Sequence, residues 1–271
     1  NYFSSFYARR VLRILPVYYF VVTLVALYYI GLKGLTEYLN ILPHYYLFLS
    51  NFLDDHIPLL SPTWSLAVEE QYYLIWPLVL MSLPRRLVLP ALALAIAANV
   101  LTAMGAFGLT AATLGPLRFG LPNPTYAPIL IGSALAVLLD RRDSFAGLWP
   151  VLGQPVAGPL AFGLILVLLQ TMPEDLRGWP NLAMHLAMAA ALAALVMRED
   201  HPMASALRWR PVARVGEISY GIYLYHLIAL HIATVALAKA GVSAAPVILF
   251  CYAVLSVLIA ELSDRTLERF F

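Results

Sequence analysis

The chain has 271 residues, of which 62% are hydrophobic and only 12% are charged. Soluble domains carry about 25% charged residues, so this composition excludes an ordinary soluble enzyme and predicts an all-α, polytopic transmembrane helical bundle. The formal net charge is +2 and Cys251 is the single cysteine, so the sequence predicts neither a nucleic-acid partner nor an internal disulfide. It also lacks the Cys/His spacing of a metal site, and we expect no bound metal or cofactor.

Several apolar segments approach the length of about 20 residues that a helix needs to cross a bilayer. They predict eight spans, at about 14–31, 62–83, 87–107, 125–139, 149–170, 181–197, 215–238 and 244–262. A ninth apolar segment, 39–53, is short and contains Pro43 and His44, so we expect it to be re-entrant or interfacial. We interpret residues 1–271 as a single transmembrane domain.

The basic residues predict an orientation for these spans. With residues 1–12 and the C-terminus in the cytoplasm, 13 of the 17 Lys and Arg residues lie on the cytoplasmic side. This bias agrees with the positive-inside rule, and it would be lost if 39–53 spanned. Residues 32–61, which include the acidic sequence DDHIPLLSP, are therefore expected outside.

The first polar cluster is the arginine patch of FYARRVLRILP, residues 6–16. Arg9, Arg10 and Arg13 lie where the first helix is expected to leave the cytoplasmic interface. They orient the helix by the positive-inside rule, or they bind a phosphorylated cytosolic donor, because Arg recognises phosphate well. The Arg-rich segment 198–214 is expected to be a solvated cytoplasmic loop.

The second cluster is the acid pair in SPTWSLAVEEQYYLIW, residues 61–76. Ser61 is expected to be the N-cap of this helix, with Pro62 in its first turn. Glu69 and Glu70 would then lie roughly 12 Å along the axis from Ser61, where an ionised acid needs a partner. The spacing predicts one stripe of Ser65, Glu69, Tyr72 and Trp76, and a second stripe of Thr63, Leu66, Glu70 and Tyr73. The pair is either structural or an acid/base or substrate-binding site open to the outer face.

The third cluster is GEISYGIYLYHLIALH, residues 216–231, where His226 falls near the middle of a predicted span. Ser219, Tyr223, His226 and Leu230 are expected to share a face. A neutral imidazole must satisfy two ring nitrogens, so a packed structural histidine competes with a functional one. We interpret His185 as structural and consider that His44 could line an outer pocket.

Three segments together resemble the integral membrane acyltransferases of acyltransferase family 3. They are FYARRVLRILPVYY, SPTWSLAVEEQYYLIWPLVL and EISYGIYLYHL, which occur in the family's order and spacing between residues 6 and 227. A fourth segment, RFGLPNPTYAPILIGSALAVLL (118–139), resembles the family more loosely. The resemblance implies about ten helices and transfer of an acyl group, commonly acetyl, from cytosolic acyl-CoA to a hydroxyl of an extracytoplasmic or lipid-linked carbohydrate. It implies a multi-pass protein of the cell membrane.

The resemblance also implies roles for particular residues. Glu69 or Glu70 would position the acceptor hydroxyl or orient a catalytic histidine, and the patch of Arg9, Arg10 and Arg13 would hold the CoA phosphates. Further candidates for substrate or donor binding are Trp64, Ser65, Tyr220 and His226. The family starts with two more helices, the first of which carries an Arg and a His thought to act in acyl transfer. Those helices are absent here, so we expect the domain to be incomplete and this chain alone not to acylate.

Two other functions compete with the acyltransferase. A proton-coupled secondary transporter would also use intramembrane Glu and His, although the sequence shows no inverted repeat. A non-catalytic scaffold or sensor would tolerate replacement of both acids.

Overall fold

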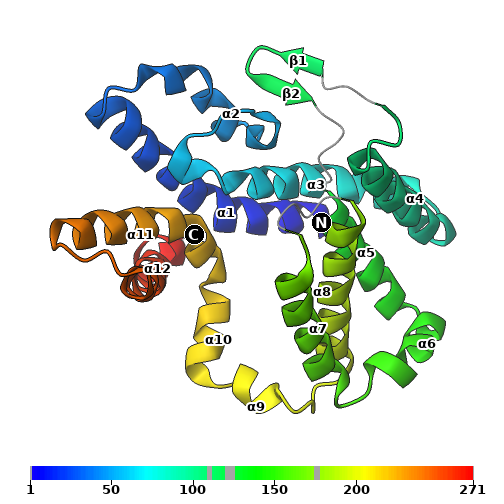
Figure 1. Cartoon of the computed structure of the whole chain (residues 1–271). Helices are drawn as coiled ribbons and strands as arrows, with labels where there is room; N and C mark the ends of the chain where they lie inside the picture. Colours follow the sequence, from blue (N-terminus) through cyan, green and yellow to red (C-terminus); the bar gives the residue numbers. More distant parts are fainter. Residues whose placement is uncertain (1, 109–111, 120–125, 174–177, 271) are drawn as a thin grey trace. The chain divides into compact units, whose positions relative to one another are not determined.

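The computed structural model describes residues 2–108, 112–119, 126–173 and 178–270, and most of these residues are helical (Figure 1). The chain divides into two compact units, each described here by itself. Unit 1 contains residues 1–67 and 209–271, and unit 2 contains residues 68–208. Helix α3 (Thr63–Ser82) begins in unit 1 and continues in unit 2.

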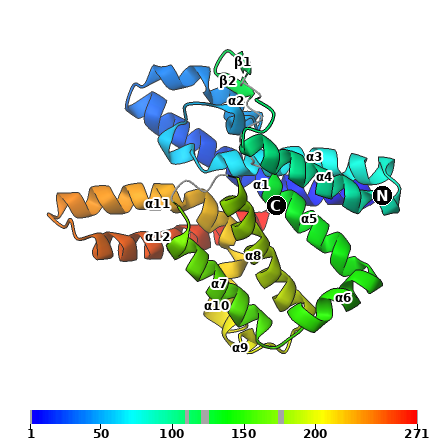
Figure 2. The ribbon, with the colours of Figure 1, turned by 45° about the vertical axis from the view of Figure 1, so that its right-hand side comes forward.

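Unit 1 is built on one long helix and a helical hairpin. Helix α1 (Tyr2–Ala26) continues as a π-helical turn, Leu27–Leu32. Short helical turns follow at Thr36–Asn40, α2 (Leu42–Tyr46), Ser50–Phe52 and Pro58–Leu60. The rest is α10 (Arg210–Glu217), the hairpin of α11 (Ser219–Lys239) and α12 (Ala245–Thr266), and a C-terminal 3₁₀ turn, Glu268–Phe270. Figure 2 shows α11 and α12 running side by side.

Unit 2 contains the remainder of α3 and the helices from the middle of the sequence. These are α4 (Arg85–Ala103), α5 (Ala127–Asp140), α6 (Arg142–Leu152), α7 (Ala157–Thr171), α8 (Trp179–Met197) and α9 (Ala204–Leu207). A hairpin of β1 (Ala112–Leu114) and β2 (Leu117–Phe119) lies between α4 and α5. The sequence pattern did not predict it, because strands of three residues are too short to show an alternating pattern.

The helices confirm an integral membrane protein of the helical type, but not the count of eight spans. Within the described residues, five helices are long and apolar enough to cross a membrane, namely Phe3–Leu32, α4, α8, α11 and α12. The span predicted at 149–170 is instead the pair α6 and α7, which bend by 73° at their junction and bring the number to at most six. Two predicted spans fall short among the described residues. Helix α5 has 14 residues, about 21 Å of helix, and α3 includes the polar stretch around Glu69 and Glu70.

Segment 39–53 forms no helix of spanning length, as its short apolar run predicted. It folds back onto α1, where the hydroxyl of Tyr18 donates to the backbone oxygen of Tyr45 at 2.8 Å. The hydroxyl of Tyr45 in turn accepts the backbone N–H of Ile57 at 2.9 Å, and all three side chains are buried. Because Tyr18 is near the middle of the continuous helix Phe3–Leu32, this segment packs against the middle of that helix.

The start of α3 packs against both α1 and α11. The turn Pro58–Leu60 packs on α1, and the backbone oxygen of Pro62 accepts a hydrogen bond from Tyr223 of α11. The predicted N-cap is wrong: Ser61 has helical backbone angles and closes the preceding 3₁₀ turn, and α3 begins at Thr63. The hydroxyl of Thr63, the first residue of α3, donates to Leu60 O at 2.7 Å.

Cysteine labelling tests the predicted orientation. With Cys251 replaced by serine, a cysteine placed at the exposed Asp55 should react in intact cells with a maleimide that cannot cross the membrane. A cysteine at the exposed Arg142 should react only after the membrane is opened, because the positive-inside rule places it in the cytoplasm. The Cys251→Ser chain measures background labelling, and the reverse pattern would overturn the orientation.

Candidate functional site

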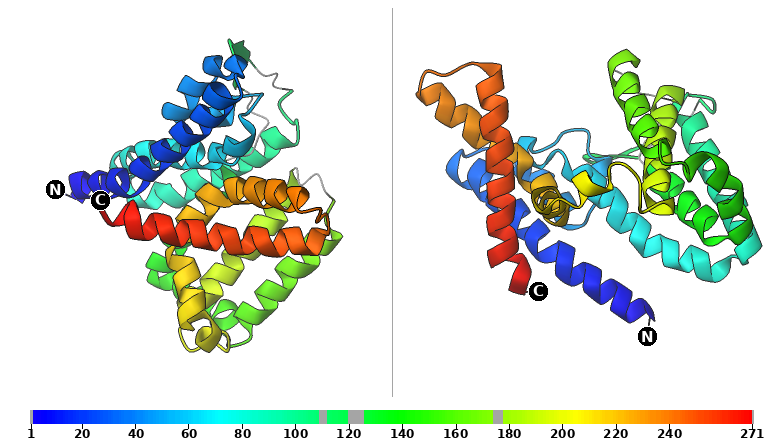
Figure 3. Two further views of the ribbon diagram at one scale, coloured as in Figure 1. Left: turned by 90° about the vertical axis from the view of Figure 1, so that its left-hand side faces the viewer. Right: turned by 90° about the horizontal axis from the view of Figure 1, so that it is seen from below.

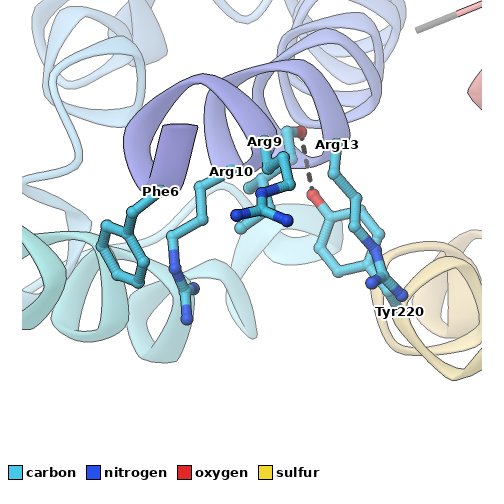
Figure 4. Close-up of a pocket in the computed structure, with 6 residues that line it drawn as sticks. Phe6, Arg9, Arg10, Arg13 and Tyr220 are labelled. Atoms are coloured by element: carbon cyan, nitrogen blue, oxygen red, sulfur yellow. Dashed lines mark hydrogen bonds between the residues drawn. The ribbon is translucent and has the colours of Figure 1, made fainter. Parts of the chain in front are cut away.

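Three arginines of α1 line a cavity of about 400 Å³ in unit 1. The lining residues are Phe6, Arg9, Arg10, Arg13, Ile14 and Tyr220. In Figure 4 the three guanidinium groups extend from one side of α1, and Arg13 lies beside the ring of Tyr220. Guanidinium groups bind phosphate through charge-assisted hydrogen bonds, so a cavity with three of them is suited to a polyphosphate.

Local helical spacing and one long-range contact position these side chains. The guanidinium of Arg10 lies 4.9 Å from the ring centre of Phe6, one turn earlier, and Arg9 Nε donates to Ser5 O at 3.1 Å. The hydroxyl of Tyr220 donates to Ile14 O at 3.0 Å and thereby joins α11 to α1. The structure thus brings the predicted site residue Tyr220 to the three predicted arginines, although more than 200 positions separate them in the sequence.

Tyr223 is hydrogen-bonded to both of the predicted site residues Ser65 and His226. The hydroxyl of Tyr223 is hydrogen-bonded to Ser65 and to Pro62 O at the start of α3. One turn along α11, His226 Nδ1 lies 2.6 Å from Tyr223 O. A carbonyl oxygen only accepts, so we assign the proton to Nδ1, which leaves Nε2 of the neutral ring as an acceptor. The predicted site residue Trp64 is 40% exposed.

Glu69 and Glu70 are both half-buried on α3, in the part of this helix that belongs to unit 2. The hydroxyl of Tyr73 lies 3.4 Å from Glu69 Oε2, although the two predicted stripes paired Tyr73 with Glu70. This contact joins the two predicted stripes, because a helix places positions i and i+4 almost as close as i and i+3.

The residues beside the acid pair tie α3 to α5. The hydroxyl of Tyr126 donates to Gln71 Oε1 at 2.6 Å, and Tyr72 is hydrogen-bonded to Ser133. Tyr72 also stacks on Trp76 at 5.3 Å between ring centres, which agrees with the predicted stripe. These contacts fix the rotation of α3 and hence the direction in which both acids leave the helix.

An ion-pair network in unit 1 corrects the prediction for segment 198–214. Arg214 lies in α10 rather than in a solvated loop, and its Nε donates to Glu261 Oε2 at 2.8 Å. It also binds Glu217 at 3.0 Å and Asp264. The Glu261 carboxylate, followed by those of Asp264 and Glu217, raises the pKa of Arg214 above its usual range. The acids at 261 and 264 are spaced i, i+3 on α12, a signal that could have suggested a basic partner.

Among the described residues, the contacts of three other histidines do not link them to the arginine cavity or to the acid pair. The buried Nδ1 of His185 has no hydrogen-bond partner in the described part of the chain, and His44 Nδ1 lies 3.2 Å from Ile41 O. Sequence reasoning missed His56, which lies 3.3 Å from the Tyr45 hydroxyl. Burial lowers the pKa of His56, against the opposing charge of Asp55. Across residues 2–108, 112–119, 126–173 and 178–270, no three His, Cys, Asp or Glu side chains are grouped to hold a metal ion.

Comparison with known proteins identifies the family. A model of the acyltransferase domain matches residues 1–262, so the chain belongs to this family. The chain is similar to the peptidoglycan O-acetyltransferase OatA of Listeria monocytogenes, with 27% identity over 82% of the chain and 39% of the relative. It is also similar to the putative peptidoglycan O-acetyltransferase YrhL of Bacillus subtilis, with 30% identity over 62% of the chain and 28% of the relative. The chain therefore spans well under half the length of these relatives. No solved structure matches it.

Proposed function

We propose that this chain is the membrane domain of an O-acyltransferase that moves an acyl group, most simply acetyl, from acyl-CoA to a carbohydrate hydroxyl. Membership of the acyltransferase domain family over residues 1–262 supports acyl transfer. The names of the two relatives, both peptidoglycan O-acetyltransferases, support a carbohydrate of the cell envelope as the acceptor.

The observation that carries the donor assignment is the arginine cavity. Arg9, Arg10 and Arg13 present three positive charges around about 400 Å³, and CoA carries its phosphates at one end. The apolar lining of Phe6, Ile14 and Tyr220 suits the adenine ring or the start of the pantetheine arm. We place the remainder of that arm along α11, from Tyr220 past Tyr223 to His226. Six residues of helix cover about 9 Å, a distance that an extended pantetheine arm can reach.

The reaction needs few groups from the protein. The acceptor oxygen forms a bond to the acyl carbonyl carbon while the carbon–sulfur bond breaks, and CoA leaves as the thiol. A base removes the hydroxyl proton, and we propose that Glu69 or Glu70 positions the hydroxyl or orients this base. Ser65 and Trp64, on the preceding turn of α3, are proposed to contact the substrate. We further propose a cell-membrane protein with a cytoplasmic C-terminus, in which donor and acceptor approach from opposite sides.

Mass spectrometry of cell-envelope glycans tests the activity. Cells that carry the gene should show O-acetylated sugars that are missing from a deletion strain and return when the gene is restored. Alkali removes O-acetyl but not N-acetyl groups, so loss of the mass difference after mild alkali identifies the ester. Identical glycans in both strains would reject the proposed activity.

A further inference from the structure

The C-terminal 3₁₀ turn, Glu268–Phe270, lies beyond residues 1–262 that match the family model. It packs on the end of α12 and on α1, the helix that carries the arginines (Figure 3). The contact places an acidic residue, Glu268, in the neighbourhood of the arginine cavity.

Two contacts fix the Glu268 carboxyl group. Ser263 Oγ of α12 donates to Glu268 Oε1 at 3.2 Å, and Ser263 is itself 3.1 Å from the hydroxyl of the buried Tyr225. The same Oε1 lies 3.4 Å from the position that a Cβ on Gly221 would occupy. Gly221 directly follows Tyr220, which lines the cavity, so the carboxyl group lies against the backbone that holds the cavity wall.

Charged groups on three elements face this carboxyl group. Burial, the largest effect, raises the pKa of Glu268, and the nearby Asp264 of α12 raises it further. The hydrogen bond from Ser263, and after it Arg13 of α1 and Arg214 of α10, act in the opposite direction. Arg214 is already bound to Glu217, Glu261 and Asp264, whereas Arg13 belongs to the cavity. The Glu268 carboxyl group therefore places a negative charge beside the cavity wall at Gly221 and on the turn that packs on α1, which carries Arg13.

We infer that Glu268, at the edge of the arginine cavity, opposes the binding of the ligand's phosphates through its negative charge. The inference rests on the proposed function, in which the cavity holds the phosphate end of CoA. Acyl-CoA and the product CoA carry the same phosphates, so a cavity that binds these phosphates too tightly would release the product slowly. A carboxylate at one edge of the cavity weakens the binding of both acyl-CoA and CoA, so that the product can be replaced by new donor.

The sign of the pH dependence follows. Above its pKa Glu268 is ionised and opposes phosphate binding, so affinity is lower. As the pH falls through that pKa, which lies above the usual carboxyl range, this opposition is lost and affinity rises. Glu268→Gln has no such titration and should bind tightly throughout.

Calorimetry on the full-length protein in nanodiscs tests this inference with two probes, CoA and inorganic pyrophosphate. Near neutral pH, Glu268→Gln should bind both roughly three- to tenfold more tightly, because one repulsive charge near the cavity is removed. The affinity of the wild type should approach that of the variant as the pH falls. Because both proteins meet the same probe, comparing their affinities at each pH removes the effect of the probe's own titration. Glu268→Asp keeps the charge and should stay close to wild type. Glu217→Gln, an equal charge change on α10, should have little effect.

The outcomes separate the inference from the proposed function. Unchanged affinity in Glu268→Gln, or equal shifts in the Gln and Asp variants, would overturn the role of the Glu268 charge. Binding of pyrophosphate without binding of CoA would reject the CoA donor while the Glu268 comparison still decides the inference. If wild type and Glu268→Gln bind neither probe, both proposals are wrong.

Discussion

Replacing Glu69 or Glu70 by glutamine is expected to lower O-acyl transfer by about 100-fold or more, the range that a positioned acid or base contributes. Glutamine has nearly the same shape but can neither hold a negative charge nor accept a proton. Both acids are half-buried on α3, so the amide should be tolerated within the helix. Transfer is measured by glycan mass spectrometry in cells that carry the whole gene.

Membrane abundance must be measured in the same samples. A purely structural pair would give poorly inserted protein, because unpaired polar groups within a membrane bundle are costly. Glu37→Gln, the same chemical change at an exposed turn, should leave both activity and abundance unchanged. Normal acylation by both single variants would remove the acids from the proposed mechanism.

Replacing Arg9 and Arg13 together by glutamine is expected to weaken CoA binding by about 100-fold. A hydrogen bond to a charged group contributes about 1.5–3 kcal/mol, so each residue alone should account for roughly tenfold or more. Lysine at the same two positions should give an intermediate loss, because it keeps the charge but not the two-pronged guanidinium contact. Affinity is measured by calorimetry in nanodiscs, at two salt concentrations.

Arg86→Gln provides the matched control, because Arg86 is exposed at the start of α4 and lies outside the cavity. It should bind CoA as the wild type does. Because the cavity residues Arg9 and Arg13 are exposed, CoA affinity should also fall as salt rises. Unchanged affinity in the double glutamine variant would show that the arginines orient α1 in the membrane and do not bind the donor.

The amino-acid sequence by itself determined the membrane class, the positions of most helices and the family. Apolar runs are local, and the free energy of placing them in a bilayer depends on composition and length, so α4, α8, α11 and α12 were predicted without tertiary information. The arginine patch was recognisable for the same reason, since residues 9, 10 and 13 share one side of a single helix.

The tertiary structure decided what these helices bring together. Tyr220 joins the arginine cavity through a hydrogen bond to Ile14, 206 positions away in the sequence. Arg214 is hydrogen-bonded to Glu261, 47 positions away. Segment 39–53 folds back onto α1 at Tyr18, and the start of α3 is hydrogen-bonded to Tyr223 of α11. Helical periodicity limits which side chains share a face of one helix, but packing of the buried tyrosines selects the partner helix and the depth at which they meet.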